Sequence, residues 1–135
     1  MPVDSEDLIA CARRAAACSW SPYSRFPVGA ALLCADGTVV SGTNVENRSY
    51  GLTNCAERSA LFAAVSMGKR DFAALAVYCP GSDRPVAPCG ACRQVLSEFC
   101  PPGMPVYYGG ADATIAATTI GELLPADSLH DLKER

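Results

Sequence analysis

Three cysteines occupy positions that suit a metal ion. Cys55 precedes a stretch rich in alanine and leucine, and Cys89 and Cys92 form a C-x-x-C pair before a second helix-like stretch. A helix N-terminus lowers the pKa of a thiol through its dipole and its free N–H groups. If the two helices lie side by side, the three thiolates meet at one point. Three protein ligands leave the fourth position of zinc open for water, as in catalytic zinc sites.

Other interpretations fit the same cysteines. C-x-x-C spacing also occurs in redox dithiols of the thioredoxin type, and Cys55 taken alone could be a small buried residue. A structural site with four cysteines needs one more thiol, for which Cys79 is the nearest candidate. The remaining cysteines lie in apolar stretches and are expected to be core or near-surface thiols: Cys11, Cys18, Cys34 and Cys100.

A carboxylate, Glu57, lies two residues after Cys55. The chain has a single histidine, His130, near its C-terminal end, so catalysis by a Ser–His–Asp or Cys–His arrangement is not expected. A general acid or base is therefore expected to be a carboxylate, and beside an open zinc site Glu57 can move protons to and from water. The alternative role is structural, because Asn54 and Glu57 have the spacing of a capping box.

The composition limits the class of protein. The chain has 135 residues, of which 50% are hydrophobic and 19% charged, so we expect one domain, 1–135, with its own core. The net charge is −3 and the basic residues are scattered, which argues against a nucleic-acid-binding face. No apolar stretch approaches the roughly 18 residues of a membrane span, and the acidic N-terminus lacks a signal-peptide pattern. We therefore expect a cytoplasmic protein whose eight thiols stay reduced.

The hydrophobic pattern predicts alternating helices and strands. The predicted helices cover residues 4–18, 54–67, 89–99 and 119–124, and the predicted strands cover 28–34, 38–45, 73–79, 105–108 and 114–118. Ser5 and Thr119 are expected to cap the first and last helices, Gly68 to end the second, and Gly109-Gly110 to join the last two strands. This order predicts an α/β fold, a mixed sheet with helices on both faces.

Cys55-Ala56-Glu57, followed by Pro88-Cys89-Gly90-Ala91-Cys92, resembles the signature of the zinc-dependent cytidine deaminases. Cysteine as the first ligand is similar to the small homotetrameric nucleoside deaminases, whereas the nucleic-acid editors of the superfamily carry histidine there. The resemblance extends over most of the chain, from Pro22 to Pro125. It implies a three-layer α-β-α sandwich with a mixed five-stranded sheet, one Zn²⁺ per chain and a homotetramer. It also implies a small nucleoside substrate, and neither a nucleic-acid nor a membrane partner.

The resemblance further implies a role for each site residue. Cys55, Cys89 and Cys92 would bind zinc, Glu57 would be the proton shuttle, and Arg58 would hydrogen-bond the thiolate sulfurs. On the substrate side, the Ala56 N–H would hold the pyrimidine carbonyl, Phe26 would lie against the base, Asn44 and Glu46 would bind a ribose hydroxyl, and Tyr50 would reach a neighbouring subunit's site. The implied reaction is hydrolytic deamination of cytidine and 2′-deoxycytidine to uridine and 2′-deoxyuridine plus ammonia, a step of pyrimidine salvage. Without the resemblance, Phe26, Asn44, Glu46, Tyr50 and Arg58 would be ordinary packing, turn or surface residues.

The sequence departs from the family pattern near its end. Many tetrameric relatives carry a phenylalanine three residues after Leu-Leu-Pro, where it reaches a partner subunit's site, and here that position is Ser128, followed by Leu129. One rival function is deamination of a cytosine-containing aminonucleoside antibiotic of the blasticidin type, which shares the three-cysteine zinc site. Asn44-Val45-Glu46 argues against it, since these residues suit a ribose. A zinc-stabilised module without enzymatic activity and a redox protein are rivals of other classes.

Overall fold

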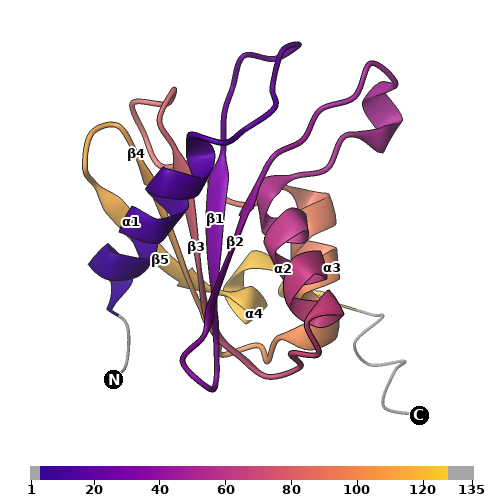
Figure 1. The fold of residues 1–135 in the computed structure, drawn as a ribbon. Coiled ribbons are helices and arrows are strands. Elements are labelled where there is room, and N and C mark those ends of the chain that lie inside the picture. The colour runs from indigo at the N-terminus through magenta and orange to yellow at the C-terminus, as the bar shows by residue number, and fades with distance from the viewer. Residues whose placement is uncertain (1–3, 128–135) are drawn as a thin grey trace.

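The computed structural model describes residues 4–127, which form three layers around a five-stranded sheet (Figure 1). The strands are β1 (Gly29–Cys34), β2 (Val39–Thr43), β3 (Phe72–Cys79), β4 (Pro105–Gly110) and β5 (Ile115–Thr119), in the spatial order β2-β1-β3-β4-β5. The helices are α1 (Ser5–Ala16), α2 (Ala56–Ser66), α3 (Gly90–Phe99) and α4 (Ile120–Leu123), with a 3₁₀ turn at Tyr50–Leu52. Helix α1 covers one face of the sheet, and α2 and α3 cover the other. The expected three-layer α-β-α sandwich with a mixed five-stranded sheet is confirmed.

The strand directions place two helix starts at one end of the sheet. Only β3 and β4 run parallel, and the connection between them crosses one face of the sheet through α3. In the antiparallel pairs of β1, Gly29 lies opposite both Thr43 of β2 and Tyr78 of β3. The chain therefore leaves β2 and β3 at the same end, and from there it enters α2 and α3.

The sheet separates two apolar clusters. On the α1 side, Leu8 and Ala12 pack with Ala31 and Ala76. On the other side, the buried residues of α2 and α3 pack with alternate residues of the same strands, Leu32 and Leu75 among them. Every residue of β1 is buried, as expected for a central strand covered on both faces. Both faces of the sheet are thus used for packing, which fixes the helices that carry the site.

Most element boundaries agree with the sequence prediction, and two local assignments were wrong. The N-cap of α1 is Asp4, whose carboxylate accepts the Asp7 N–H at 2.8 Å, because Ser5 is already helical. Gly109 and Gly110 belong to β4 and not to the turn, since they pair with the last two residues of β3. The predicted Thr119 cap and the Gly68 helix end are confirmed, with Gly68 at a φ of +87°.

Some expectations fall outside the part of the chain that the structure describes. Ser128, Leu129 and His130 lie outside residues 4–127. Within that range, no helix combines the length and the apolar character needed to cross a bilayer.

Candidate active site

Helices α2 and α3 both begin at a cysteine. Cys55 is the N-cap of α2 and Cys89 the N-cap of α3, both in extended conformation, and neither side chain makes a capping hydrogen bond. Cys92 lies in the first turn of α3 and is fully buried. The two helix starts therefore supply three thiols that are not used to cap the backbone.

The distances between the three sulfurs fit one zinc ion. The Sγ atoms of Cys55 and Cys89 are 3.8 Å apart, those of Cys89 and Cys92 are 3.4 Å apart, and all three lie within 4.8 Å of one another. Sulfurs at the corners of a tetrahedron with zinc–sulfur bonds of about 2.3 Å lie about 3.8 Å apart. Thiolates are preferred zinc ligands, so both the donor set and its spacing fit the ion.

The fourth corner of this site is not a protein thiol. Cys79 does not belong to the group of three cysteines, although it lines the same cavity at the end of β3. Burial, together with the charge of Glu57, raises the pKa of Cys79 to about 11. Among the described residues, the metal group is thus limited to three ligands, and the four-cysteine alternative is wrong. A zinc ion held here keeps one open position, as catalytic zinc does.

Arg58 balances part of the thiolate charge. Its Nη2 donates a hydrogen bond to the Cys55 Sγ at 3.2 Å. Hydrogen bonding from the Cys92 thiol, and then from Arg58, lowers the pKa of Cys55, whereas the same hydrogen bond to Cys55, together with burial, raises the pKa of Cys92. The dipoles of two helix N-termini act in the same direction as Arg58. Arg58 and the helix dipoles therefore favour the thiolate form of Cys55 despite its partial burial.

Glu57 is buried at the start of α2 with only 5% of its surface exposed. The capping-box alternative is wrong, because the N-cap is Cys55 and the Asn54 N–H donates instead to the Val45 carbonyl at 2.9 Å. Burial raises the pKa of Glu57, so its carboxyl group can hold a proton at a higher pH than an exposed glutamate. A buried carboxyl group of this kind beside a zinc site suits proton transfer.

The cysteines and Glu57 open into a cavity of about 280 Å³ at the ends of β2 and β3. Seven of the ten predicted site residues line it: Phe26, Asn44, Glu46, Cys55, Ala56, Glu57 and Cys89. Of the other three, Cys92 is fully buried with its sulfur next to that of Cys89, and Arg58 donates a hydrogen bond to Cys55. Tyr50 lies apart, with 74% of its surface exposed, at an adjoining hollow that also includes Glu46.

Sequence reasoning missed part of this wall. Ser24, Thr53 and Val86 also line the cavity. Ser24 lies between the first predicted helix and the first predicted strand, where we assigned it no role, and Thr53 and Val86 lie in loops without a local signal. These residues reach the cavity because distant segments of the chain pack together, and the spacing of residues in the sequence does not predict such packing.

Asn44 has a structural role in addition to its place in the cavity. Its Oδ1 accepts hydrogen bonds from the Ser19 hydroxyl and from the Val28 N–H, and its Nδ2 donates to the Phe26 carbonyl at 2.9 Å. These three bonds tie the segment of residues 19–28 to the end of β2. Phe26 therefore reaches the cavity from a loop that Asn44 holds in place.

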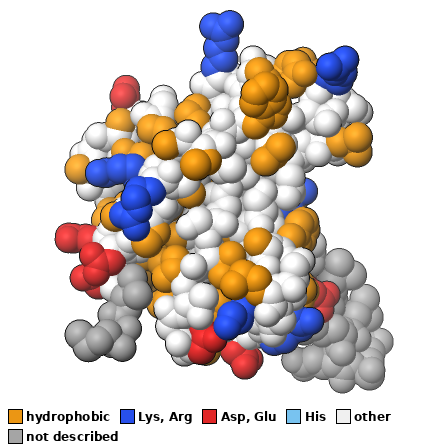
Figure 2. Space-filling view, in the orientation of Figure 1, with side chains coloured by type: hydrophobic (Ala, Val, Ile, Leu, Met, Phe, Trp, Pro, Cys, Tyr) orange, Lys and Arg blue, Asp and Glu red, His pale blue; other side chains and the backbone are white. Residues whose placement is uncertain are grey.

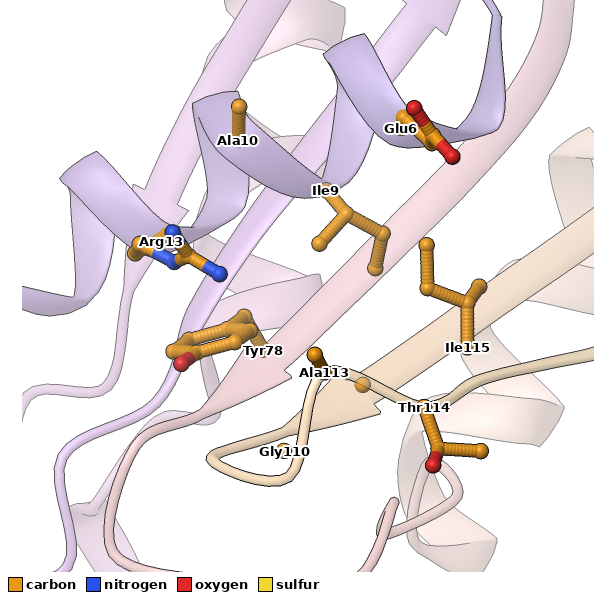
Figure 3. A pocket seen from close by; sticks show the side chains of 10 residues that line it. Glu6, Ile9, Ala10, Arg13, Tyr78, Gly110, Ala113, Thr114 and Ile115 are labelled. Atoms are coloured by element: carbon orange, nitrogen blue, oxygen red, sulfur yellow. The ribbon is translucent and has the colours of Figure 1, made fainter.

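A second cavity of similar size, about 270 Å³, lies on the opposite face of the sheet (Figure 3). Helix α1 and the ends of β3 and β4 form it, and the Arg13 guanidinium lies over the Tyr78 ring at 4.9 Å. Neither Glu57 nor any of the three clustered cysteines lines it. The chemistry of the molecule is therefore concentrated at the first cavity.

Comparison with known proteins agrees with this geometry. Residues 2–108 match the family model described as the cytidine and deoxycytidylate deaminase zinc-binding region. The cytidine deaminase of Sporosarcina psychrophila is 53% identical over 131 residues, with 96% of each chain covered. That of Halalkalibacterium halodurans is 54% identical over 133 residues, covering 96% of this chain and all of the relative.

Solved structures give the same result. The 1.6 Å crystal structure of cytidine deaminase from Burkholderia pseudomallei superposes with a TM-score of 0.89 at 47% identity. The match covers 92% of this chain and 98% of that one. On the family match, the identity to these relatives and the three-cysteine site, the chain belongs to the cytidine and deoxycytidylate deaminase family.

Proposed function

We propose that the chain, as one domain over residues 1–135, hydrolyses cytidine and 2′-deoxycytidine to uridine and 2′-deoxyuridine. Water adds at C4 of the pyrimidine, the bond from C4 to the exocyclic nitrogen breaks, and ammonia leaves. The observation that carries the proposal is the buried Glu57 carboxyl group in the same cavity as the Cys55 and Cys89 thiols. Hydrolytic deamination requires a proton carrier at that place, and the family match over residues 2–108 favours this chemistry over that of a redox dithiol.

Glu57 is the proton carrier of the proposed reaction. Its carboxylate accepts a proton from the attacking water, and the protonated form donates to ring N3 and then to the departing ammonia. The raised pKa of Glu57 supports this role, because an acid that holds its proton more firmly can deliver it later in the cycle. One zinc ion per chain, held by Cys55, Cys89 and Cys92, supplies Lewis-acid activation of water.

The substrate contacts follow from the cavity wall. The Ala56 N–H, the first amide of α2, lacks an acceptor within its own helix and is proposed to hold the pyrimidine carbonyl. Phe26 is proposed to lie against the base, and Asn44 and Glu46 to bind a ribose hydroxyl. Arg58 is proposed to stabilise the ligand thiolates, which its hydrogen bond to the Cys55 sulfur supports.

The direct test measures zinc per chain and then follows ultraviolet absorbance after addition of cytidine. The proposal predicts about one zinc per chain, as three thiolates at one site require, and conversion of cytidine to uridine. Zinc binding without conversion of cytidine would favour a structural module. A chain that binds no zinc, and whose function is lost in Cys92→Ser, would favour a redox protein. Blasticidin S as a parallel substrate tests the antibiotic alternative, for which turnover of blasticidin S but not of cytidine is required.

We also propose that the chain forms a homotetramer. Large hydrophobic side chains are exposed on the two loops that flank the cavity, including Trp20 at 61%, Tyr50 at 74% and Leu52 at 72%. Figure 2 shows hydrophobic side chains on the surface at this end of the molecule. A second copy that covers them would bring its own Tyr50 towards the site. Light scattering tests this proposal, which predicts a molar mass in solution of four times the chain mass of 14.1 kDa.

A cytoplasmic location and a place in pyrimidine salvage complete the proposal. None of the eight cysteines, all of which lie within the described residues, forms a disulfide, which supports a reducing compartment. Fractionation of cells that produce the chain tests the location. Growth of a cytidine-deaminase-deficient, pyrimidine-requiring host on cytidine tests the salvage role.

A further inference from the structure

The backbone on both sides of Glu46 is fixed by two neighbouring segments. The Glu46 N–H donates to the Trp20 carbonyl at 2.8 Å, and the Trp20 N–H donates to the Asn44 carbonyl at 3.1 Å. On the other side, Val45 and Asn54 exchange two backbone hydrogen bonds of 3.0 and 2.9 Å. The Glu46 side chain therefore starts from a rigid position between the 19–28 segment and the start of α2.

The Glu46 carboxylate is held by three donors from one short segment. The N–H groups of Tyr23 and Ser24 both donate to Oε1, at 2.9 and 3.1 Å, and the Ser24 hydroxyl donates to Oε2. An ionised carboxylate offers about four acceptor positions. The two backbone N–H groups occupy both acceptor positions of Oε1, and the Ser24 hydroxyl occupies one of the two positions of Oε2. The one free acceptor position is therefore on Oε2, the atom that the Ser24 hydroxyl orients.

Ser24 is itself held in a single orientation. Its Oγ accepts the Phe26 N–H at 3.0 Å, which directs the hydroxyl hydrogen towards Glu46. Arg25, between the two residues, has a φ of +57°, and its N–H donates to the Ser21 carbonyl at 2.9 Å. This tight turn brings Ser24 and Phe26 to the same cavity wall as Glu46.

We propose that Ser24 is a positioning residue for substrate recognition: it orients the Glu46 carboxylate so that Oε2 presents its free acceptor position to a sugar hydroxyl of the nucleoside. The proposal rests on the proposed function, and it adds a residue that acts through Glu46 and not on the base. Since Ser24 also fixes the Phe26 N–H, one hydroxyl group links the sugar-binding and base-binding parts of the wall.

The charge of Glu46 agrees with this arrangement. The hydrogen bond from the Ser24 hydroxyl, with the two backbone N–H groups, lowers the pKa of Glu46, so the carboxylate remains an acceptor throughout the neutral range. An acceptor with one free position favours a ligand that donates, such as a sugar hydroxyl, over one that carries hydrogen or fluorine there.

The test compares Ser24→Ala with the wild type on cytidine and on 2′,3′-dideoxycytidine, which lacks the 2′- and 3′-hydroxyls of cytidine. We expect Ser24→Ala to raise the KM for cytidine about tenfold, the order of effect of one hydrogen bond to a charged group. We expect kcat to change less than about threefold, and the KM for dideoxycytidine to stay within the same range, because the lost bond acts through the hydroxyl contact. Ser24→Thr, which keeps the hydroxyl, should restore the cytidine KM.

Two further variants separate positioning from general damage. In a Glu46→Gln background, Ser24→Ala should have no additional effect on the cytidine KM, because the two changes break one interaction. Ser66→Ala, at an exposed serine near the end of α2, serves as the matched control and should behave as the wild type. Thermal unfolding of each variant shows whether it is folded at the assay temperature. If Ser24→Ala is not folded, Ser24→Cys, whose thiol is a weaker donor than the hydroxyl, replaces it and should raise the KM for cytidine but not that for dideoxycytidine.

Distinct results would overturn the proposal. An unchanged cytidine KM in Ser24→Ala, or an equal rise for cytidine and dideoxycytidine, would show that Ser24 does not act through the hydroxyl contact. An additive effect in the Glu46→Gln background would do the same. If the wild type converts neither nucleoside, the proposed function itself fails, which is distinguishable because that result does not depend on Ser24.

Discussion

The Sγ atom of Cys55 lies 3.8 Å from the Sγ atom of Cys89, although 34 positions separate the two residues in the chain. The contact exists because α2 and α3 pack on the same face of the sheet and start at the same end of it (Figure 1). Any change that moves one helix start relative to the other therefore changes the metal site.

Replacement of the proposed proton carrier should separate metal binding from turnover. We expect Glu57→Gln to keep its zinc, because Glu57 is not one of the ligands, and to lose turnover by several orders of magnitude. General acid–base catalysis contributes about 100- to 10,000-fold, and an amide cannot carry the proton. Steady-state kinetics and metal analysis of the same preparation check both parts. Glu6→Gln, at an exposed glutamate of α1, is the control. Near-normal activity of Glu57→Gln would contradict the assignment.

Removal of the guanidinium beside the ligands should weaken zinc binding. Arg58 stabilises the Cys55 thiolate, so Arg58→Gln should raise the pKa of Cys55 and move formation of the thiolate to higher pH. Zinc binding requires the thiolate, so the loss of affinity should be larger at low pH than at high pH. Changes around metal ligands typically lower affinity about 10- to 100-fold. Chelator competition at two pH values measures the effect. Arg58→Lys should retain part of the affinity, and equal affinity of Arg58→Gln and wild type at both pH values would refute the role.

Removal of the metal should abolish activity while leaving the fold in place. The two apolar clusters on either side of the sheet do not depend on zinc, so we expect the far-ultraviolet circular dichroism to persist in the chelated protein. Zinc joins two helix starts, so its loss should lower the free energy of unfolding by about 2–4 kcal/mol at zinc concentrations well above Kd. Thermal melts with and without zinc, with activity regained on re-addition, check this. Complete unfolding on chelation would favour a structural zinc site.

The packing of α2 on β2 depends on the absence of a side chain at Gly42. A Cβ there would lie 2.7 Å from the Ala56 carbonyl oxygen and would also collide with the Ala60 amide nitrogen. Gly42→Ala should therefore push α2 away from the sheet, cost about 1–3 kcal/mol of stability and lower activity by displacing Cys55 and Glu57. Gly103→Ala is the control, since its Cβ would meet no atom within 4 Å. Equal melting temperatures and activities of the two variants would contradict this account of the packing.

The chain's local signals predicted most of the fold. The end of α2 at Gly68 and the Thr119 cap both depend on the intrinsic preferences of residues close in sequence, and both agree with the structure. The two wrong assignments depend on competition. Asp4, and not Ser5 as we expected, is the N-cap residue of α1. Gly109 and Gly110, which we expected in a turn, pair with β3 and are therefore part of strand β4.

By itself, the sequence determined which residues have the right chemistry. It contains three thiols predicted at helix starts, a carboxylate two residues after the first of them, and a single histidine, His130. Only the tertiary structure decided whether Glu57 is a capping residue or a buried acid. The Asn54 N–H, which Glu57 would accept in a capping box, donates instead to the Val45 carbonyl. Likewise, the hold of Ser24 on Glu46 joins residues 22 positions apart. Helix starts and turns are set by neighbouring residues, whereas burial, hydrogen-bond competition and the meeting of sulfurs arise only when distant segments pack together.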